Sequence, residues 1–164
     1  MSTTGVTFAA GAALLFVASM VVESVLLRWR INAYFQAGFP LFLTMVPIPN
    51  APEGSGSTAT VRWEVTGDLV RWWADPAMRS APSGLHGSVQ LAAGQGGVHL
   101  FVRWAPPWTP LLAAAWLIGL GMVRGEAMVT LPIGLVMIAG VLFLYRQAAV
   151  RAVAEMRWAW VQQA

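Results

Sequence analysis

The chain has 164 residues, of which 57% are hydrophobic and only 10% are charged. A soluble domain typically carries about 25% charged residues, so the composition favours a protein that lipid partly covers. The ten basic residues are all arginine and are spread along the chain, which argues against a nucleic-acid-binding surface. The absence of cysteine excludes disulfides, thiolate nucleophiles, and zinc or iron–sulfur sites built on cysteine.

The first apolar segment covers residues 6–27 and contains one charged side chain, Glu23. As a helix it is roughly 33 Å long, enough to cross a hydrocarbon core of about 30 Å. A cleaved signal peptide would carry basic residues before its apolar segment, whereas Arg28 and Arg30 follow this one. We therefore predict an uncleaved transmembrane helix, whose helical pattern extends to residue 37.

Residues 39–105 predict a small antiparallel β-domain of about four strands, because alternating apolar and polar residues recur there. Residues 47–58 are rich in proline, glycine and hydroxyl side chains and predict a flexible loop. Asp68 is typical of a helix cap, which predicts a short helix with Leu69, Val70, Trp72 and Trp73, followed by a disordered stretch to Gly84. The expected strands are 39–46, 60–66, 85–92 and 97–104.

The two strands 85–92 and 97–104 form the clearest predicted hairpin. Pairing Leu91 with Val98 separates an apolar face from a polar one, and a slip of one residue would destroy that separation. This register places His86 and His99 on the polar surface, about 13 Å apart, too far to share a metal ion. No phosphate-binding loop, nucleophile elbow or zinc-protease motif is present, so we predict no catalytic, cofactor-binding or metal-binding residues.

Two further apolar segments, 106–123 and 127–145, predict a second and a third transmembrane helix joined by a tight turn. Residues 146–164 predict a helical tail with an apolar stripe, and packing on the β-domain, on the membrane or on a partner would each bury it. The expected fold is thus an α+β membrane protein, with the β-domain inserted between transmembrane helices 1 and 2. The stripe comprises Leu142, Tyr145, Ala149, Val153, Met156 and Trp160.

Three spans would place residues 28–105 and 146–164 on the same side of the membrane. Nine of the ten arginines lie in these two segments, and only Arg124 lies elsewhere. Arginine near transmembrane helices favours the cytoplasmic side. We therefore predict a multi-pass protein of the plasma membrane, as in a bacterial inner membrane, with the N-terminus outside and the β-domain and C-terminus in the cytoplasm.

Three groups of residues are candidates for function. Glu23 is either a polar site inside the membrane or an interfacial side chain that reaches toward Arg28 or water. Small residues on the second apolar segment allow helices to approach closely, within the chain or between subunits. An arginine beside paired tryptophans predicts a docking patch for a membrane or a partner, unless the tryptophans belong to the core or the aromatic belt. The small residues are Ala115, Gly119 and Gly121. The residues of the predicted docking patch are Arg71, Trp72 and Trp73.

The leading functional hypothesis is a non-catalytic integral membrane protein that serves as an accessory, assembly or scaffolding subunit of a membrane complex. Its expected partners are the lipid bilayer and other membrane subunits or a second copy, without nucleic acid and without a cofactor. One alternative is a membrane-anchored β-domain that senses lipid headgroups or a ligand. A second alternative is a transporter or membrane-enzyme component that uses Glu23.

Overall fold

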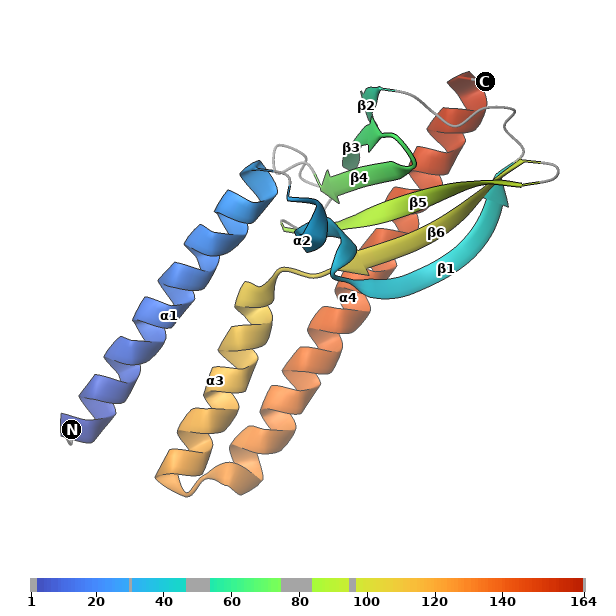
Figure 1. Ribbon diagram of the computed structural model, residues 1–164. Coiled ribbons are helices and arrows are strands. Elements are labelled where there is room, and N and C mark those ends of the chain that lie inside the picture. Colours follow the sequence, from blue (N-terminus) through green and yellow to red (C-terminus); the bar gives the residue numbers. More distant parts are fainter. Residues whose placement is uncertain (1–2, 30, 47–53, 75–83, 95–96, 164) are drawn as a thin grey trace. The chain divides into compact units, whose positions relative to one another are not determined.

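The computed structural model describes residues 3–29, 31–46, 54–74, 84–94 and 97–163. Within them the chain is α+β, with helices and a six-stranded antiparallel sheet, as Figure 1 shows. This confirms the predicted class and the predicted antiparallel β-domain. The elements are α1 (Thr3–Arg28), α2 (Asn32–Gln36), β1 (Phe39–Val46), β2 (Ser55–Ser57), β3 (Val61–Thr66), β4 (Leu69–Ala74), β5 (His86–Gly94), β6 (Gly97–Ala105), α3 (Trp108–Arg124) and α4 (Ala127–Gln163).

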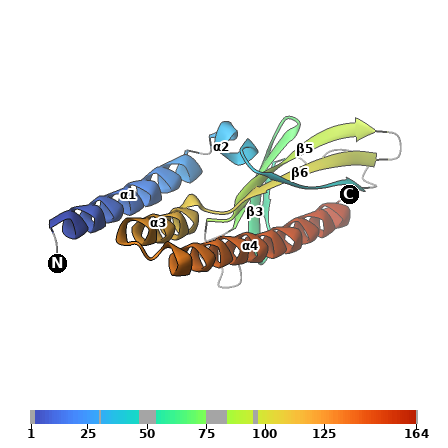
Figure 2. The same ribbon diagram turned by 90° about the horizontal axis from the view of Figure 1, so that it is seen from below.

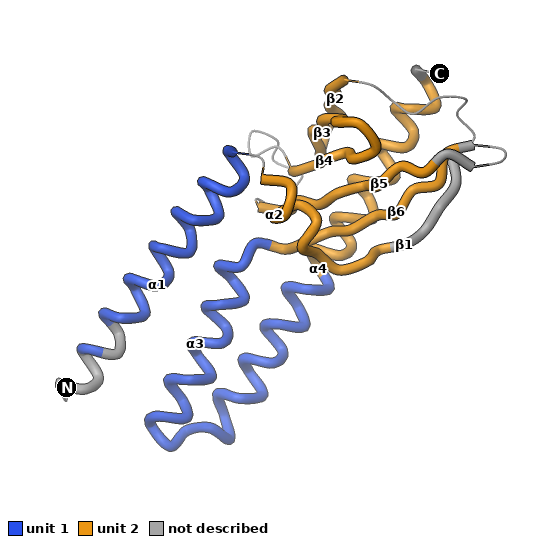
Figure 3. The backbone as a smooth tube through the Cα atoms, viewed as in Figure 1, with its two compact units in different colours: residues 1–29, 107–143 blue, residues 30–106, 144–164 orange. Residues whose placement is uncertain are grey.

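The chain divides into two compact units, which Figure 3 colours separately. The first unit, residues 1–29 and 107–143, contains α1, α3 and the first part of α4. The second unit, residues 30–106 and 144–164, contains α2, the sheet and the rest of α4.

Two helices are long and apolar enough to cross a membrane, over Ala10–Arg28 in α1 and Ala127–Gln162 in α4. Only 6% of an apolar 18-residue stretch within each helix is buried inside the protein. The helix α3 has 17 residues, or about 25 Å, which is shorter than an ordinary span. Of the three predicted spans, two therefore have the length and composition that a membrane crossing needs.

The first helix does not continue to residue 37 as predicted. It ends at Arg28, and the separate helix α2 begins at Asn32 after an extended Ile31 with φ −67° and ψ 117°. The local apolar pattern continues across this break, but Tyr34 and Phe35 are buried within the second unit. Tyr34 and Phe35 thus take part in the packing of the second unit, which the local apolar pattern does not represent.

The strand order is β1-β6-β5-β4-β3-β2, so the sheet has six strands where about four were predicted. The strand β2 lies inside the predicted flexible loop, and β4 replaces the predicted short helix. Pairing with β3 and β5 supplies the backbone hydrogen bonds of β4, which outweighs its local helical pattern. Asp68 lies in the β3–β4 turn beside Gly67, whose φ is 63°. Residues 47–53 of the predicted loop and most of the predicted disordered stretch lie outside the described residues.

The hairpin of β5 and β6 forms with a register two residues away from the predicted one. Leu91 pairs with Leu100 and Val89 with Val102, whereas the prediction paired Leu91 with Val98. A shift of two residues keeps every side chain on its predicted face. The separation of the faces is thus confirmed, and the specific partners were wrong.

The core lies between one face of the sheet and the C-terminal half of α4, which runs along that face in Figure 2. A row of aromatic residues crosses this face, because Trp63 pairs with Trp72, and Gly87 lies between Trp72 and Trp104. Trp63 also meets Trp160 of α4 edge-on, with ring centroids 6.2 Å apart. Of the three placements predicted for the tail, the structure shows packing on the β-domain. The buried residues of the tail are Ala149, Ala152, Val153, Met156 and Trp160.

Candidate ligand-binding groove

The outer face of the sheet, opposite α4, is partly covered by the short helix α2. Tyr34 stacks on His86 with centroids 4.2 Å apart and an interplanar angle of 16°. Phe35 meets His86 and Trp73 edge-on, at 5.6 and 6.2 Å. Tyr34 and Phe35 are both buried. The helix therefore closes one end of this face and leaves the other end open.

His86 is fully buried, so the prediction of a surface histidine was wrong. The helix α2, which covers His86, comes from a distant part of the chain. The alternation of residues along the strand therefore could not predict this burial. The Nδ1 atom of His86 lies 2.8 Å from the carbonyl oxygen of Gly84 and donates to it, because a carbonyl can only accept. Burial lowers the pKa of His86, which favours the neutral ring. Within the described residues, Nε2 has no hydrogen-bond partner.

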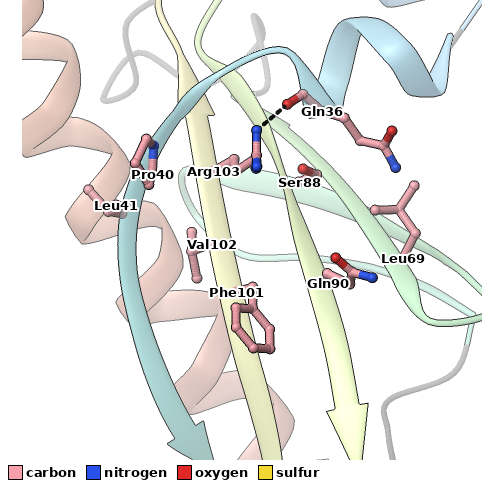
Figure 4. Close-up of a pocket in the computed structure, with 9 residues that line it drawn as sticks. All are labelled: Gln36, Pro40, Leu41, Leu69, Ser88, Gln90, Phe101, Val102 and Arg103. Atoms are coloured by element: carbon pink, nitrogen blue, oxygen red, sulfur yellow. Dashed lines mark hydrogen bonds between the residues drawn. The ribbon is translucent and has the colours of Figure 1, made fainter.

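Beside α2 the outer face carries a groove of about 690 Å³, within the range of ordinary ligand sites. Figure 4 shows that Gln36 and Arg103 lie at one end and Gln90 and Phe101 further along the strands. The groove combines a guanidinium, a hydroxyl and amide groups with apolar side chains. Its described lining residues are Gln36, Pro40, Leu41, Leu69, Ser88, Gln90, Phe101, Val102 and Arg103.

Two arginines flank the floor of the groove, because Ser88 pairs with Arg71 on one side and Arg103 on the other. The guanidinium of Arg71 lies 3.4 Å from the Glu64 carboxylate. It also donates to Asn32 of α2 at 3.1 Å. Arg71 is therefore neutralised and joins α2 to the sheet.

Arg103 has a different environment. Its side chain is exposed, and Nη1 donates to the backbone carbonyl of Gln36 at 3.3 Å. No carboxylate of the described residues pairs with it. The Gln36 carbonyl occupies one of the five guanidinium N–H donors. The groove thus contains a positioned cation that no carboxylate of the described residues neutralises.

The wall of the groove along β1 depends on a β-bulge. Pro40 pairs with Arg103 and Phe42 with Val102, so Leu41 is an extra residue between two successive pairs. A bulge bends its strand and redirects side chains, and such bulges are frequent at sheet edges. Pro40 has no N–H to donate, which suits an edge strand. Leu41 lines the groove at this point.

The three residues of the predicted docking patch are separated by the fold. Trp72 is fully buried in the core, which removes it from any docking surface. Trp73 packs against Phe35 on the outer face, and Arg71 borders the groove. The segment is a strand, whose consecutive residues point to opposite faces, so Trp72 enters the core whereas Arg71 and Trp73 lie on the outer face.

Glu23 is buried in the first unit, where it lies against the beginning of α3. Its carboxylate accepts hydrogen bonds from the backbone N–H of Trp108 and from the Thr109 hydroxyl, the latter at 2.8 Å. Pro107 and Pro110 lack the N–H groups that a helix start leaves unpaired, and Glu23 satisfies Trp108 between them. The helix dipole also favours a carboxylate at this end. The structure therefore places Glu23 between α1 and α3.

The small residues of α3 divide between two surfaces. A Cβ atom at Gly121 would collide with the side chain of Thr130 on α4, so this glycine permits the close approach of the two helices. A Cβ at Gly119 would meet nothing within 4 Å, and Ala115 is exposed. Ala115 and Gly119 thus leave a small-residue surface that α4 does not use.

No protein-family model, curated protein or solved structure matches the chain. The function must therefore be inferred from the groove and the helices themselves. Sequence reasoning did not single out Ser88, Gln90, Phe101 or Arg103 as a site. Their alternation placed them on one polar face, and that signal would have identified the floor of the groove if the register had been known.

Proposed function

We propose that the protein is a non-catalytic membrane protein whose β-domain binds a small ligand in the groove beside Arg103. The observation that carries this proposal is the groove, where an exposed guanidinium adjoins apolar side chains and has no carboxylate partner in the described part of the chain. Such a mixture of apolar lining and few polar groups is typical of ligand sites. This corresponds to the hypothesis of a ligand-sensing β-domain on a membrane anchor.

The membrane part of the proposal is supported by α1 and by the first part of α4. Their apolar segments are almost entirely uncovered by the rest of the protein, and such a surface is unfavourable in water. We propose that α3 is the third span, in which Trp108 lies at the interface and the preceding prolines extend the apolar stretch. With three spans the sheet and the C-terminal tail would lie on the same side of the membrane, and their arginines favour the cytoplasmic side.

Native mass spectrometry of the full chain in a mild nonionic detergent tests the groove. We expect the wild-type protein to retain a bound small molecule. Gln90→Trp fills the groove from its floor and should abolish retention. Ala154→Trp adds an indole at an exposed position of α4 and should leave retention unchanged. Equal retention in all three proteins, or none in the wild type, would contradict the proposal.

Alkaline carbonate washing tests the membrane anchor separately. An integral protein stays in the membrane pellet, because its apolar helices cannot leave the bilayer when ionic contacts are removed. We expect the full chain to remain in the pellet after washing. Release into the supernatant would refute the anchor and leave the groove measurement unaffected.

A second candidate function is an accessory subunit that contacts another membrane protein through the first unit. An apolar groove of about 650 Å³ lies between α1 and α3, and Ala12, Ala18 and Ala113 are among its lining residues. Small residues allow helices to approach closely in lipid. The hydroxyl of Ser19 is buried and has no hydrogen-bond partner among the described residues.

The mass of the detergent-extracted assembly distinguishes this candidate. We expect a mass above that of one chain, and Ala113→Phe should reduce it because the phenyl ring fills the groove. Ala139→Phe, at an exposed position of α4, is the matched control and should preserve the assembly. A lone monomer at all concentrations would refute the accessory role.

A further inference from the structure

We propose that the ligand of the groove is an amphipathic monoanion, whose oxyanion pairs with Arg103 and whose apolar part lies along Phe101. This inference rests on the proposed function, because it names the chemical class that the groove binds. It joins two features of the groove, an uncompensated single charge and an exposed apolar surface beside it.

The charge follows from the row of residues that crosses the outer face. Glu64, Arg71, Ser88 and Arg103 lie side by side on adjacent strands. Glu64 neutralises Arg71 at 3.4 Å, so the row retains a single positive charge, on Arg103. One negative charge on the ligand would balance it, whereas a dianion would leave an unpaired charge in the groove.

The donors of the groove suit an oxyanion. A guanidinium presents its N–H groups as a planar fork that matches carboxylate and phosphate oxygens in a bidentate manner. The hydrogen bond to the Gln36 carbonyl holds Arg103 in place at the end of α2. Ser88 and Gln90 lie on the floor of the groove and can donate neutral hydrogen bonds to the same ligand.

The apolar part of the ligand is indicated by Phe101, which is 49% exposed on the same face of β6 as Arg103. Two residues along a strand correspond to about 7 Å, the length of a short alkyl chain beyond the headgroup. Leu69 and Leu41 line the groove on the neighbouring strands. A ligand that carries both a charge and an apolar chain would bury this surface, and inorganic ions would leave it exposed.

Two kinds of molecule carry this chemistry, a fatty-acid-like carboxylate and the phosphodiester of a phospholipid headgroup. Calorimetric titration of the full chain in a nonionic detergent separates them, with octanoate and dibutyl phosphate as the probes. Octyltrimethylammonium tests the sign of the charge, and inorganic phosphate tests the need for an apolar chain. Saturable binding of octanoate alone assigns a carboxylate, binding of dibutyl phosphate alone assigns a phosphodiester, and binding of both supports the shared chemistry.

Arg103→Gln should weaken binding of the anionic probe about tenfold or more, because it removes charge-assisted hydrogen bonds. Arg103→Lys keeps the charge without the planar fork and should give an intermediate affinity. Arg62→Gln is the matched control, since Arg62 is exposed on β3 and does not line the groove. Its affinity should equal that of the wild type. The thermal midpoint of each variant verifies that it is folded.

Three results of the titrations would overturn the inference. They are equal affinity for octyltrimethylammonium and the anions, equal loss in the Arg62 and Arg103 variants, and equal affinity for inorganic phosphate and dibutyl phosphate. A neutral or cationic molecule retained in the native mass measurement would also overturn it, yet would leave the groove as a ligand site. Failure of the proposed function itself would appear as unchanged retention of the bound molecule in Gln90→Trp.

Discussion

The two faces of the sheet are built from the same strands and have opposite environments. On the face toward α4, Trp63, Trp72 and Trp104 lie in one row and are buried. On the outer face, one residue along each strand, Arg71, Ser88 and Arg103 form the parallel row. A long helix covers the first row, whereas the short helix α2 covers only part of the outer face. The comparison indicates that the α4 face serves mainly stability, and under the proposed function the outer face serves binding.

The largest loss of stability is expected from Gly87→Ala on the α4 face. A Cβ atom there would collide with the backbone carbonyl of Arg103 and would lie 2.7 Å from the Trp72 indole. Neither group can move without disturbing the sheet, so we expect the free energy of unfolding to fall by about 3 kcal/mol. Urea unfolding of the full chain in detergent measures this loss. Gly119→Ala, where a Cβ meets open space, should show no loss, and an equal loss in both variants would disprove the account.

A smaller loss is expected from Glu155→Ala, which weakens the attachment of α4 to the sheet. The Glu155 carboxylate accepts hydrogen bonds from the Thr58 and Thr60 hydroxyls at 2.9 and 2.7 Å. Removing it leaves both partly buried hydroxyls without this acceptor, so we expect a loss of about 2 kcal/mol. Arg151→Ala, at an exposed position on the same helix, is the control for thermal unfolding. If the two midpoints fell equally, the hydrogen bonds would not matter for stability.

Acid should weaken the outer face through His86. Burial lowers its pKa in the folded protein below the ordinary value of 6.5, so the unfolded chain takes up the proton first as the pH falls. The contribution of neutral His86 to the free energy of unfolding is therefore fully present above pH 6.5. It is lost progressively as the pH falls toward the lower, folded-state pKa. We therefore expect a lower free energy of unfolding at pH 5 than at pH 7.

The variant His86→Phe keeps an aromatic ring beside Tyr34 and removes the titrating group. Its unfolding free energy should depend less on pH over this range than that of the wild type. No charged side chain of α2 faces His86, and on the outer face of β4 and β6 the nearest described cations are Arg71 and Arg103. An unaltered pH dependence in His86→Phe would show that another group is responsible.

The smallest change in stability is expected from Arg103→Gln. Its side chain is exposed and makes one hydrogen bond to a backbone carbonyl, so the unfolding free energy should change by less than about 0.5 kcal/mol. The same substitution should weaken binding of the anionic probe about tenfold or more. A loss of several kcal/mol would place Arg103 with the structural residues and would remove the contrast between the faces.

Prediction from the sequence was accurate for segments whose structure is determined by their own residues. Residues 39–46 form β1 with the predicted bounds, and the α4 stripe is buried from Ala149 onward. It was inaccurate for β4, where Leu69, Val70, Trp72 and Trp73 have a spacing that also fits a helix face. Whether this segment forms a helix or a strand depended on β3 and β5, which flank β4 in the sheet. The residues of β4 alone do not indicate these neighbouring strands.

By itself the sequence determined the apolar helices, the antiparallel β-domain and the side of the sheet to which each hairpin residue points. These features follow from hydrophobic periodicity, which is a property of each segment alone. Only the tertiary structure decided the register, which moved Arg103 from opposite His86 to opposite Ser88. It also decided the cover of His86 by α2 and the open groove beside it. A period of two is unchanged by a shift of two residues, so alternation specifies a face but cannot specify the partners across it.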